Sequence, residues 1–212
     1  MSRGLFVTFE GGEGSGKSTQ MRRAAAALRE AGVEVLTTRE PGGTPVGDGI
    51  RAVLLDRAHA GMQPRAELLL YEASRAELVA SVIRPALERG TTVLCDRFAD
   101  SSVAYQAFGR GLPVDDVRAL NDLATAGLVP DRTVLLDVEP AVGLARATGG
   151  GADRLESEEL AFHQRVRDGF LRIAAADPDR FRVVDAGRSA ETVARAVAAA
   201  LADLPGPVGG RC

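Results

Sequence analysis

The chain has 212 residues, 45% of them hydrophobic, which is enough for one domain with a sizeable core. Its net charge of −3 gives no basic field, so a nucleic-acid polymer is not an expected partner. We see no signal peptide and no apolar run long enough to span a membrane, so we expect a cytoplasmic protein without membrane partners. The two cysteines, Cys95 and Cys212, are interpreted as free thiols.

In chain order, the predicted elements alternate between strands and helices. Strands are expected at 5–9, 33–38, 91–95, 132–136 and 181–184, and helices at 20–30, 46–55, 64–89, 114–126, 140–147, 156–176 and 190–204. Every crossover is long enough for a parallel connection. We therefore predict an α/β fold, a doubly wound five-stranded parallel sheet with helices on both faces. It forms a single domain over 1–204, followed by a flexible tail at 205–212.

The predicted helix 64–89 carries apolar residues on two sides. One stripe repeats at spacings of three and four from Leu69 to Leu87, and Pro85 is expected to kink the helix. A second stripe includes Tyr71 and Arg75, which are four residues apart and so share a face. Burial on two sides predicts packing against the sheet and against a further surface, such as a second subunit.

The chemistry of the chain centres on residues 11–19. They match the phosphate-loop pattern G-x-x-x-x-G-K-[ST] and lie between a predicted strand and a predicted helix. Backbone N–H groups of such a loop hold phosphate oxygens, the lysine neutralises phosphate charge, and the serine hydroxyl can bind Mg²⁺. The predicted ATP-binding residues are Gly11, Gly12, Glu13, Gly14, Ser15, Gly16, Lys17, Ser18 and Thr19.

A kinase also needs a carboxylate that holds the metal beside this loop. Two predicted strands end in an acid, Asp96 and Asp137, and either could serve. We favour Asp96, because Arg97 follows it directly and could reach a phosphate, whereas Asp137 precedes a helix entry and could simply cap it. Ser18 and Asp96 are therefore the predicted Mg²⁺ ligands.

Anionic acceptors favour arginines with their forked donors, and Arg39, Arg75 and Arg97 all lie near predicted strand ends or on the two-sided helix. Any single arginine is more often a solvated surface charge. A Gly-rich insert at about 146–155 is typical either of a mobile lid that excludes water or of a plain surface loop. Arg146 and Arg154 flank it.

The motifs together resemble the bacterial thymidylate kinases of the P-loop nucleoside monophosphate kinase family. The matching segments, spread from residue 6 to about 197, are 9–19, Thr-Arg-Glu-Pro-Gly-Gly-Thr at 38–44, Asp-Arg-Phe at 96–98, Ala-Tyr-Gln at 104–106, Gly-Arg-Gly at 109–111 and Asp-Arg-Leu-Glu at 153–156. The segment at 38–44 is the more specific signal, because many families share the phosphate loop.

This resemblance implies phosphoryl transfer from ATP to dTMP with Mg²⁺, by a homodimer. The implied catalytic residues are Lys17, Asp96, Arg97 and Arg154. The implied dTMP-binding residues are Arg39 and Arg97 at the phosphate, Tyr71 stacked on thymine, Arg75 at a base carbonyl, and Ser102, Tyr105 and Gln106 around the base and sugar.

The chain departs from the family pattern in two places. Phe98 replaces the usual Tyr or His, so a polar contact there is lost. The phosphate loop has no arginine between Gly11 and Gly16, and neither has the lid core, so Arg146 or Arg154 must substitute, or Lys17, Mg²⁺ and Arg97 neutralise the charge alone.

Two alternatives to a dTMP kinase stay open. One is a kinase for another nucleoside monophosphate or a deoxynucleoside, and the other is a nucleotide-dependent switch.

Overall fold

The computed structural model describes residues 3–147 and 153–204, so the core of the predicted lid (148–152) and the predicted tail (205–212) lie outside the described residues. The described chain contains the strands β1 (Phe6–Glu10), β2 (Val35–Arg39), β3 (Thr92–Asp96), β4 (Arg132–Asp137) and β5 (Phe181–Asp185). They form one parallel sheet in the order β2-β3-β1-β4-β5. The predicted doubly wound parallel sheet is confirmed.

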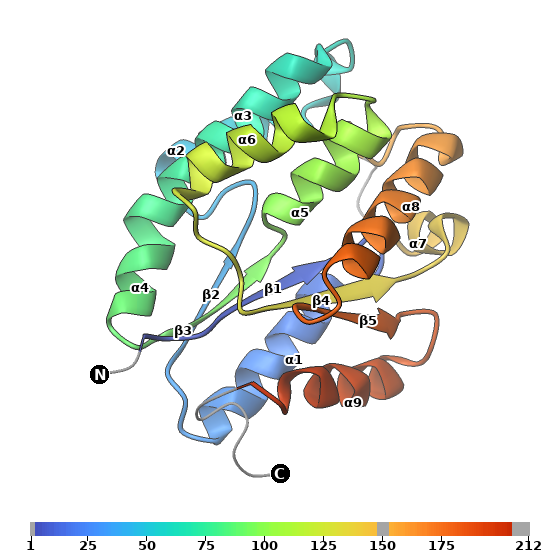
Figure 1. Cartoon of the computed structure of the whole chain (residues 1–212). Helices are drawn as coiled ribbons and strands as arrows, with labels where there is room; N and C mark the ends of the chain where they lie inside the picture. The colour runs from blue at the N-terminus through green and yellow to red at the C-terminus, as the bar shows by residue number, and fades with distance from the viewer. Residues whose placement is uncertain (1–2, 148–152, 205–212) are drawn as a thin grey trace.

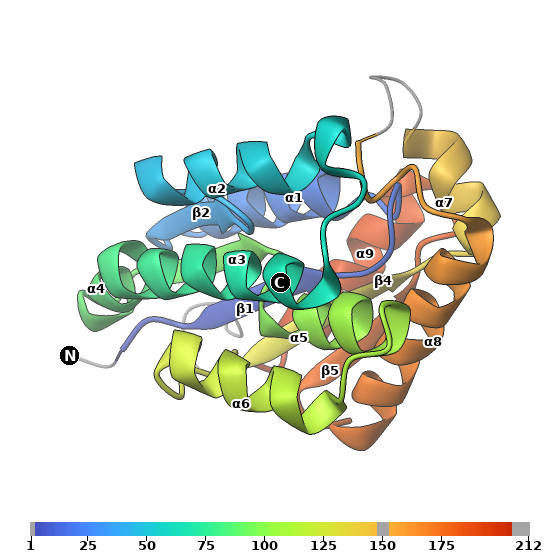
Figure 2. The ribbon, with the colours of Figure 1, turned by 90° about the horizontal axis from the view of Figure 1, so that it is seen from above.

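Helices cover both faces of this sheet (Figure 1). They are α1 (Lys17–Glu30), α2 (Pro45–Leu55), η1 (Arg57–His59), α3 (Pro64–Leu78), η2 (Val79–Ile83), α4 (Arg84–Glu88), α5 (Ala99–Ser102), η3 (Val103–Gly109), α6 (Val114–Thr125), α7 (Pro140–Ala147), α8 (Leu160–Ala176) and α9 (Ala190–Leu201). Helices α1 and α9 lie on one face, and α3 to α6 with α8 lie on the other (Figure 2). None of the described helices is long and apolar enough to cross a membrane.

The core divides between the two faces because successive strand side chains point in opposite directions. In β4, Val134 and Leu136 pack into the cluster under α1 and α9, and Leu135 packs into the cluster on the other face. All of β1, and most of β3 and β4, is buried. Central strands buried on both sides read as continuous apolar runs, which is why their positions are visible in the sequence.

The predicted helix 64–89 is present, but its regular winding is interrupted. A π-helical turn, η2, separates α3 from α4 just before Pro85. Proline has no N–H, so the carbonyl four residues earlier loses its usual helical partner. The interruption therefore lies in the turn before the proline.

The helix predicted at 156–176 begins later, at Leu160. The side chain of Asp153 explains the difference, because its Oδ1 accepts hydrogen bonds from the backbone N–H of Leu155 and of Glu156, each at 2.9 Å. A carboxylate that satisfies neighbouring N–H groups favours a turn over a helix. The segment 153–158 is therefore a compact turn that precedes α8.

Candidate active site

The phosphate loop runs from the end of β1 into the first turn of α1, and its glycines are sterically required. Gly11, Gly14 and Gly16 have φ values of 139°, 61° and 88°, a region that favours glycine. A Cβ added at Gly14 would lie 1.9 Å from the carbonyl oxygen of Gly143 in α7. The loop is thus held in its curled form by close packing against α7.

Lys17 folds back over this loop. Its Nζ donates hydrogen bonds to the carbonyl oxygens of Gly11 and Gly12 at 3.1 and 2.7 Å, and the side chain is buried. Burial, with the nearby charge of Arg97, lowers the pKa of Lys17 to about 8. A bound phosphate would supply the negative charge that favours the ammonium form.

Ser18 and Asp96 lie together at the junction of α1 and β3. The Ser18 hydroxyl donates to Asp96 Oδ2 at 2.5 Å. A hydroxyl and a carboxylate are the oxygen ligands that Mg²⁺ prefers, so this pair fits the metal. Asp137, the other candidate, accepts hydrogen bonds from Nε and Nη2 of Arg167 at 2.7 and 2.9 Å. Because both of its oxygens are already paired with an arginine, Asp96 is the better candidate for the metal ligand.

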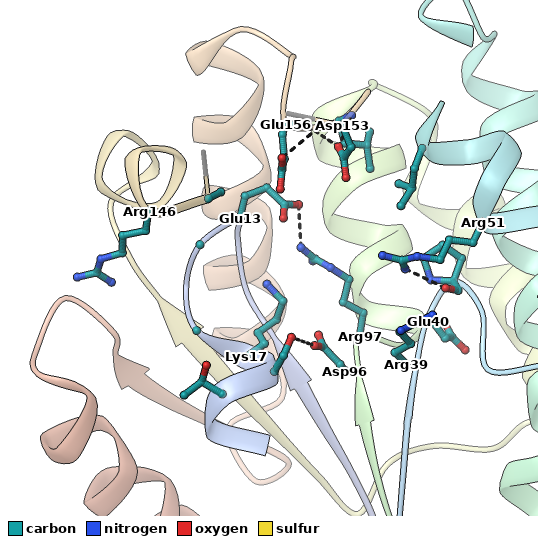
Figure 3. Close-up of a pocket in the computed structure, with 18 of the residues that line it drawn as sticks. Glu13, Lys17, Arg39, Glu40, Arg51, Asp96, Arg97, Arg146, Asp153 and Glu156 are labelled. Atoms are coloured by element: carbon teal, nitrogen blue, oxygen red, sulfur yellow. Dashed lines mark hydrogen bonds and ion pairs between the residues drawn. The ribbon is translucent and has the colours of Figure 1, made fainter. Parts of the chain in front are cut away.

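An open cavity of about 530 Å³ extends from the phosphate loop across the carboxyl ends of the strands (Figure 3). Lys17, Ser18 and Asp96 line it near the loop, and Arg39 and Tyr71 line it on the side of α2 and α3. Ligands of doubly wound folds bind at this edge of the sheet. The cavity therefore has a phosphate-loop side and a second, arginine-bearing side.

Arg97 lies between these two sides. Its Nη1 donates to the carbonyl oxygen of Gly11 at 2.9 Å, and its Nη2 donates to Glu13 at 2.8 Å. The backbone at Arg97 is left-handed, with φ 72°, which is uncommon for a residue with a side chain. The backbone N–H of the next residue, Phe98, donates a hydrogen bond to the buried carboxylate of Glu10 at 2.7 Å. This bond anchors the turn at Arg97 to the end of β1.

Glu13 belongs to the phosphate loop, yet its carboxylate points toward Arg97 (Figure 3). It also accepts a hydrogen bond from the Tyr105 hydroxyl at 2.7 Å. Burial opposes ionisation, but the charges of Arg97 and Lys17 and the Tyr105 bond outweigh it and lower the pKa of Glu13 to about 2. An anion thus stands at the border between the two sides of the cavity.

Arg39 ends β2 and lines the cavity with 58% of its side chain exposed. Arg51 of α2, which the sequence analysis missed, lines the same wall and donates to the carbonyl oxygen of Pro41 at 3.0 Å. Arg51 lies in the helix that directly follows the Arg-Glu-Pro-Gly-Gly-Thr segment, and this position is the signal that could have drawn attention to it. The second side of the cavity therefore presents two arginines besides Arg97.

Arg75 is placed differently from the expectation. Its side chain is 1% exposed and does not line the cavity. Its guanidinium donates to Glu40 and Glu72, and also to Ser102 Oγ, Asn121 Oδ1 and the Phe98 carbonyl oxygen. These partners occupy the Arg75 donors that were expected to meet a base carbonyl. One of the partners is Ser102, which was itself predicted to lie beside the base and sugar. In this structure Arg75 braces α3 against the neighbouring segments.

Tyr71, Tyr105 and Gln106 do come together, around a smaller pocket that continues from the cavity beside Arg97. Tyr71 is half-buried on α3, and the other two lie on η3, a π-helical segment. π-Helical turns are rare and often occur at functional sites. The pocket offers aromatic surface and one side-chain amide.

The two arginines that flank the predicted lid, Arg146 and Arg154, differ in their surroundings. Arg146 is exposed, lines the cavity and donates to the carbonyl oxygen of Ala186 at 2.8 Å. Arg154 is buried, with Nη1 2.6 Å from a Glu67 carboxylate oxygen and Nε donating to the Leu54 carbonyl oxygen at 2.7 Å. The structure does not bring Arg154 to the phosphate-loop side of the cavity.

A glycine-rich phosphate loop on a parallel sheet of this order, with an arginine-lined cavity opposite, defines a P-loop nucleotide-binding protein of the kinase type. A family model described as thymidylate kinase matches residues 9–197. The chain belongs to the thymidylate kinase family.

Individual relatives agree over nearly the whole length. The chain is 55% identical to a thymidylate kinase of Deinococcus radiodurans over 204 residues, covering 96% of this chain and 98% of that protein. It is 56% identical to one of Solidesulfovibrio magneticus, covering 91% and 96%. The crystal structure of thymidylate kinase from Ehrlichia chaffeensis matches with a TM-score of 0.74 at 35% identity, covering 92% of this chain and 96% of that one.

Proposed function

We propose that the protein transfers the γ-phosphoryl group of ATP to dTMP, giving dTDP and ADP. The observation that carries this proposal is the two-sided cavity, in which the phosphate loop faces Arg97, Arg39 and an aromatic pocket. A phosphate-binding loop alone suits any nucleotide triphosphatase, whereas a second anion-binding side suits a phosphorylated acceptor. Membership of the thymidylate kinase family supports dTMP as that acceptor.

On the donor side, backbone N–H groups of residues 11–19 hold the ATP phosphates and Lys17 neutralises their charge. Ser18 and Asp96 would hold Mg²⁺, which would supply positive charge beside the phosphates when bound. The support for this assignment is the direct contact between the two side chains. Phosphoryl transfer requires little covalent work by the protein, so positioning and charge neutralisation supply most of the catalysis.

On the acceptor side, Arg97 and Arg39 bind the dTMP phosphate, and Arg51 is a further candidate. Tyr71 stacks on the base and Gln106 contacts its edge. Tyr105 packs near the sugar, where a 2′-hydroxyl would be disfavoured. Arg75 and Ser102 act on this pocket indirectly, because their polar groups bond to each other within the protein.

The charge at the transferring phosphoryl group is neutralised by Lys17 and Arg97, with Arg146 as the lid arginine. Arg146 is exposed and needs only to leave the Ala186 carbonyl oxygen to reach the cavity. Arg154 would have to abandon a buried ion pair, which is strongly unfavourable. We therefore assign Arg154 a structural role in holding the end of the lid, which extends over about residues 146–155 of a single domain.

We also propose that the protein is a cytoplasmic homodimer. Leu69 of α3, with 56% of its surface exposed, and Val46 and Val53 of α2 leave apolar surface on adjacent helices. Exposed apolar side chains on adjacent helices support an interface at this part of the surface. The buried free thiol of Cys95 and the use of ATP suit the cytoplasm.

An ADP-release assay with and without an acceptor tests the activity. We expect ADP formation that depends on dTMP and Mg²⁺, with dCMP, UMP and thymidine much slower. Faster turnover of one of those acceptors would favour another nucleoside or nucleotide kinase. Slow ADP release that ignores every acceptor would favour a nucleotide-dependent switch, which has no need for the second side of the cavity.

A further inference from the structure

A buried carboxylate behind the aromatic pocket is held by three side chains from two separate segments, Gln106 and Arg110 of η3 and its C-terminal cap, and Arg154. Glu67, in the first turn of α3, has no exposed surface. Its Oε1 accepts from Gln106 Nε2 at 2.9 Å and from Arg110 Nε at 3.2 Å. Its Oε2 accepts from Arg110 Nη2 at 3.1 Å and lies 2.6 Å from Arg154 Nη1.

These partners keep Glu67 ionised. Burial opposes ionisation, but hydrogen bonds from Arg110 and Gln106 and the charges of the two arginines outweigh it, so the pKa of Glu67 lies below its ordinary value. An ionised carboxylate has only acceptors. The group that Gln106 turns toward Glu67 must therefore be its NH₂ group, because the opposite orientation would set two acceptors against each other.

The orientation of this amide decides what Gln106 can offer a ligand. Gln106 is 1% exposed and lines the small pocket together with Tyr71 and Tyr105. No hydrogen bond among the described residues ends on its Oε1. With the NH₂ group turned toward Glu67, the carbonyl oxygen is the acceptor of this amide that remains for a base.

We propose that Glu67 is a positioning residue that fixes the Gln106 amide with its carbonyl oxygen toward the base, so that the pocket selects bases with an N–H donor at N3. The inference deepens the proposed function and rests on it. Thymine carries an N–H group at N3, and the Gln106 carbonyl oxygen can accept a hydrogen bond from it. Cytosine has an unprotonated N3, and two facing acceptors leave a buried polar group unpaired, which is costly.

The decisive measurement is the ratio of kcat/KM for dTMP to that for dCMP. In the Glu67→Gln variant, residue 67 offers a donor as well as an acceptor, so the Gln106 amide can turn over. We expect the dTMP/dCMP ratio to fall about tenfold or more, in line with the loss of one oriented hydrogen bond. A matched control is Arg180→Gln, which breaks another ion pair, with Asp100 at 2.6 Å, outside both pockets of the site. It should change the ratio less than about twofold.

Gln106→Met removes the amide itself and provides a second readout if Glu67→Gln folds poorly. We expect Gln106→Met to lower the ratio as strongly, and the double variant to lower it no further. A Glu67→Gln variant that slows both substrates equally, or a Gln106→Met variant that keeps full discrimination, would overturn the role of Glu67.

Calorimetric titration of dTMP and dCMP measures the same discrimination without turnover. Preferential binding of dTMP that Glu67→Gln abolishes supports the positioning role even if no product forms, and the absence of product would then count against the proposed function alone. Turnover of dTMP with an unchanged binding ratio in Glu67→Gln would instead overturn the positioning role and leave the proposed function intact.

Discussion

Replacing Arg154 by glutamine should reduce stability far more than catalysis. The side chains of Arg154 and Glu67 are 2% and 0% exposed, and the pair is 2.6 Å apart. Breaking a buried ion pair by removing one partner costs roughly 3–5 kcal/mol. Glu67 keeps its bonds from Arg110 and Gln106, so we expect the lower end, about 3 kcal/mol. For a domain of this size, that lowers Tm by roughly 6–12 °C.

Thermal unfolding and ADP release at 25 °C, with saturating ATP and dTMP, measure the two effects separately. We expect kcat of Arg154→Gln to fall less than about tenfold, because the guanidinium does not reach the phosphate-loop side of the cavity. Arg146→Gln is the comparison, since Arg146 is exposed and should leave Tm nearly unchanged while lowering kcat. An unchanged Tm with kcat lowered about 10³-fold in Arg154→Gln would refute the reasoning and identify Arg154 as the transition-state arginine.

Three further outcomes are expected. Lys17→Ala should lower kcat about 10²-fold or more. It should not lower Tm, because burying the charged lysine without a bound phosphate destabilises the folded protein. A kcat near the wild-type value would contradict the role of Lys17. Glu13 has a pKa lowered from 4.5 to about 2, so its stabilising effect is present above about pH 4.5 and is lost as the pH falls toward 2. When the pH is lowered from 6 to 3, the free energy of unfolding measured in urea should therefore fall by roughly 2 kcal/mol less in Glu13→Gln than in the wild type. Equal falls in the two proteins would count against the Glu13–Arg97 contact. Leu69→Glu should convert the dimer to a monomer in light scattering, whereas a wild type that is itself monomeric would exclude the dimer.

The fold could be predicted because its signals are local. The central strands β1, β3 and β4 are short apolar runs, and the phosphate loop identifies the first strand-to-helix connection. The structure shifts most strand ends by one or two residues, since hydrogen bonding between strands and not composition determines where a strand stops. The late start of α8 depended on a side-chain contact of Asp153 that periodicity does not show.

The candidate site was predictable where residues follow strand ends. Lys17, Ser18, Asp96 and Arg97 were expected near one another, and the parallel sheet brings their segments to one edge. The burial of Arg75 and Arg154 was not predictable. Glu72 lies only three positions before Arg75, but the other carboxylate partners, Glu40 of Arg75 and Glu67 of Arg154, lie 35 and 87 positions away in the sequence. A lone arginine in a sequence does not reveal whether it faces a ligand or a buried acid.

The most direct measurement of the central claim follows the phosphoryl group itself. The wild-type protein is incubated with ATP labelled in its γ-phosphate, Mg²⁺ and dTMP, and the nucleotides are separated. The account predicts that the label appears in dTDP, in amounts equal to the ADP formed, and that Lys17→Ala forms little of either. Label that is released only as inorganic phosphate, or transferred to another acceptor in preference to dTMP, would contradict it.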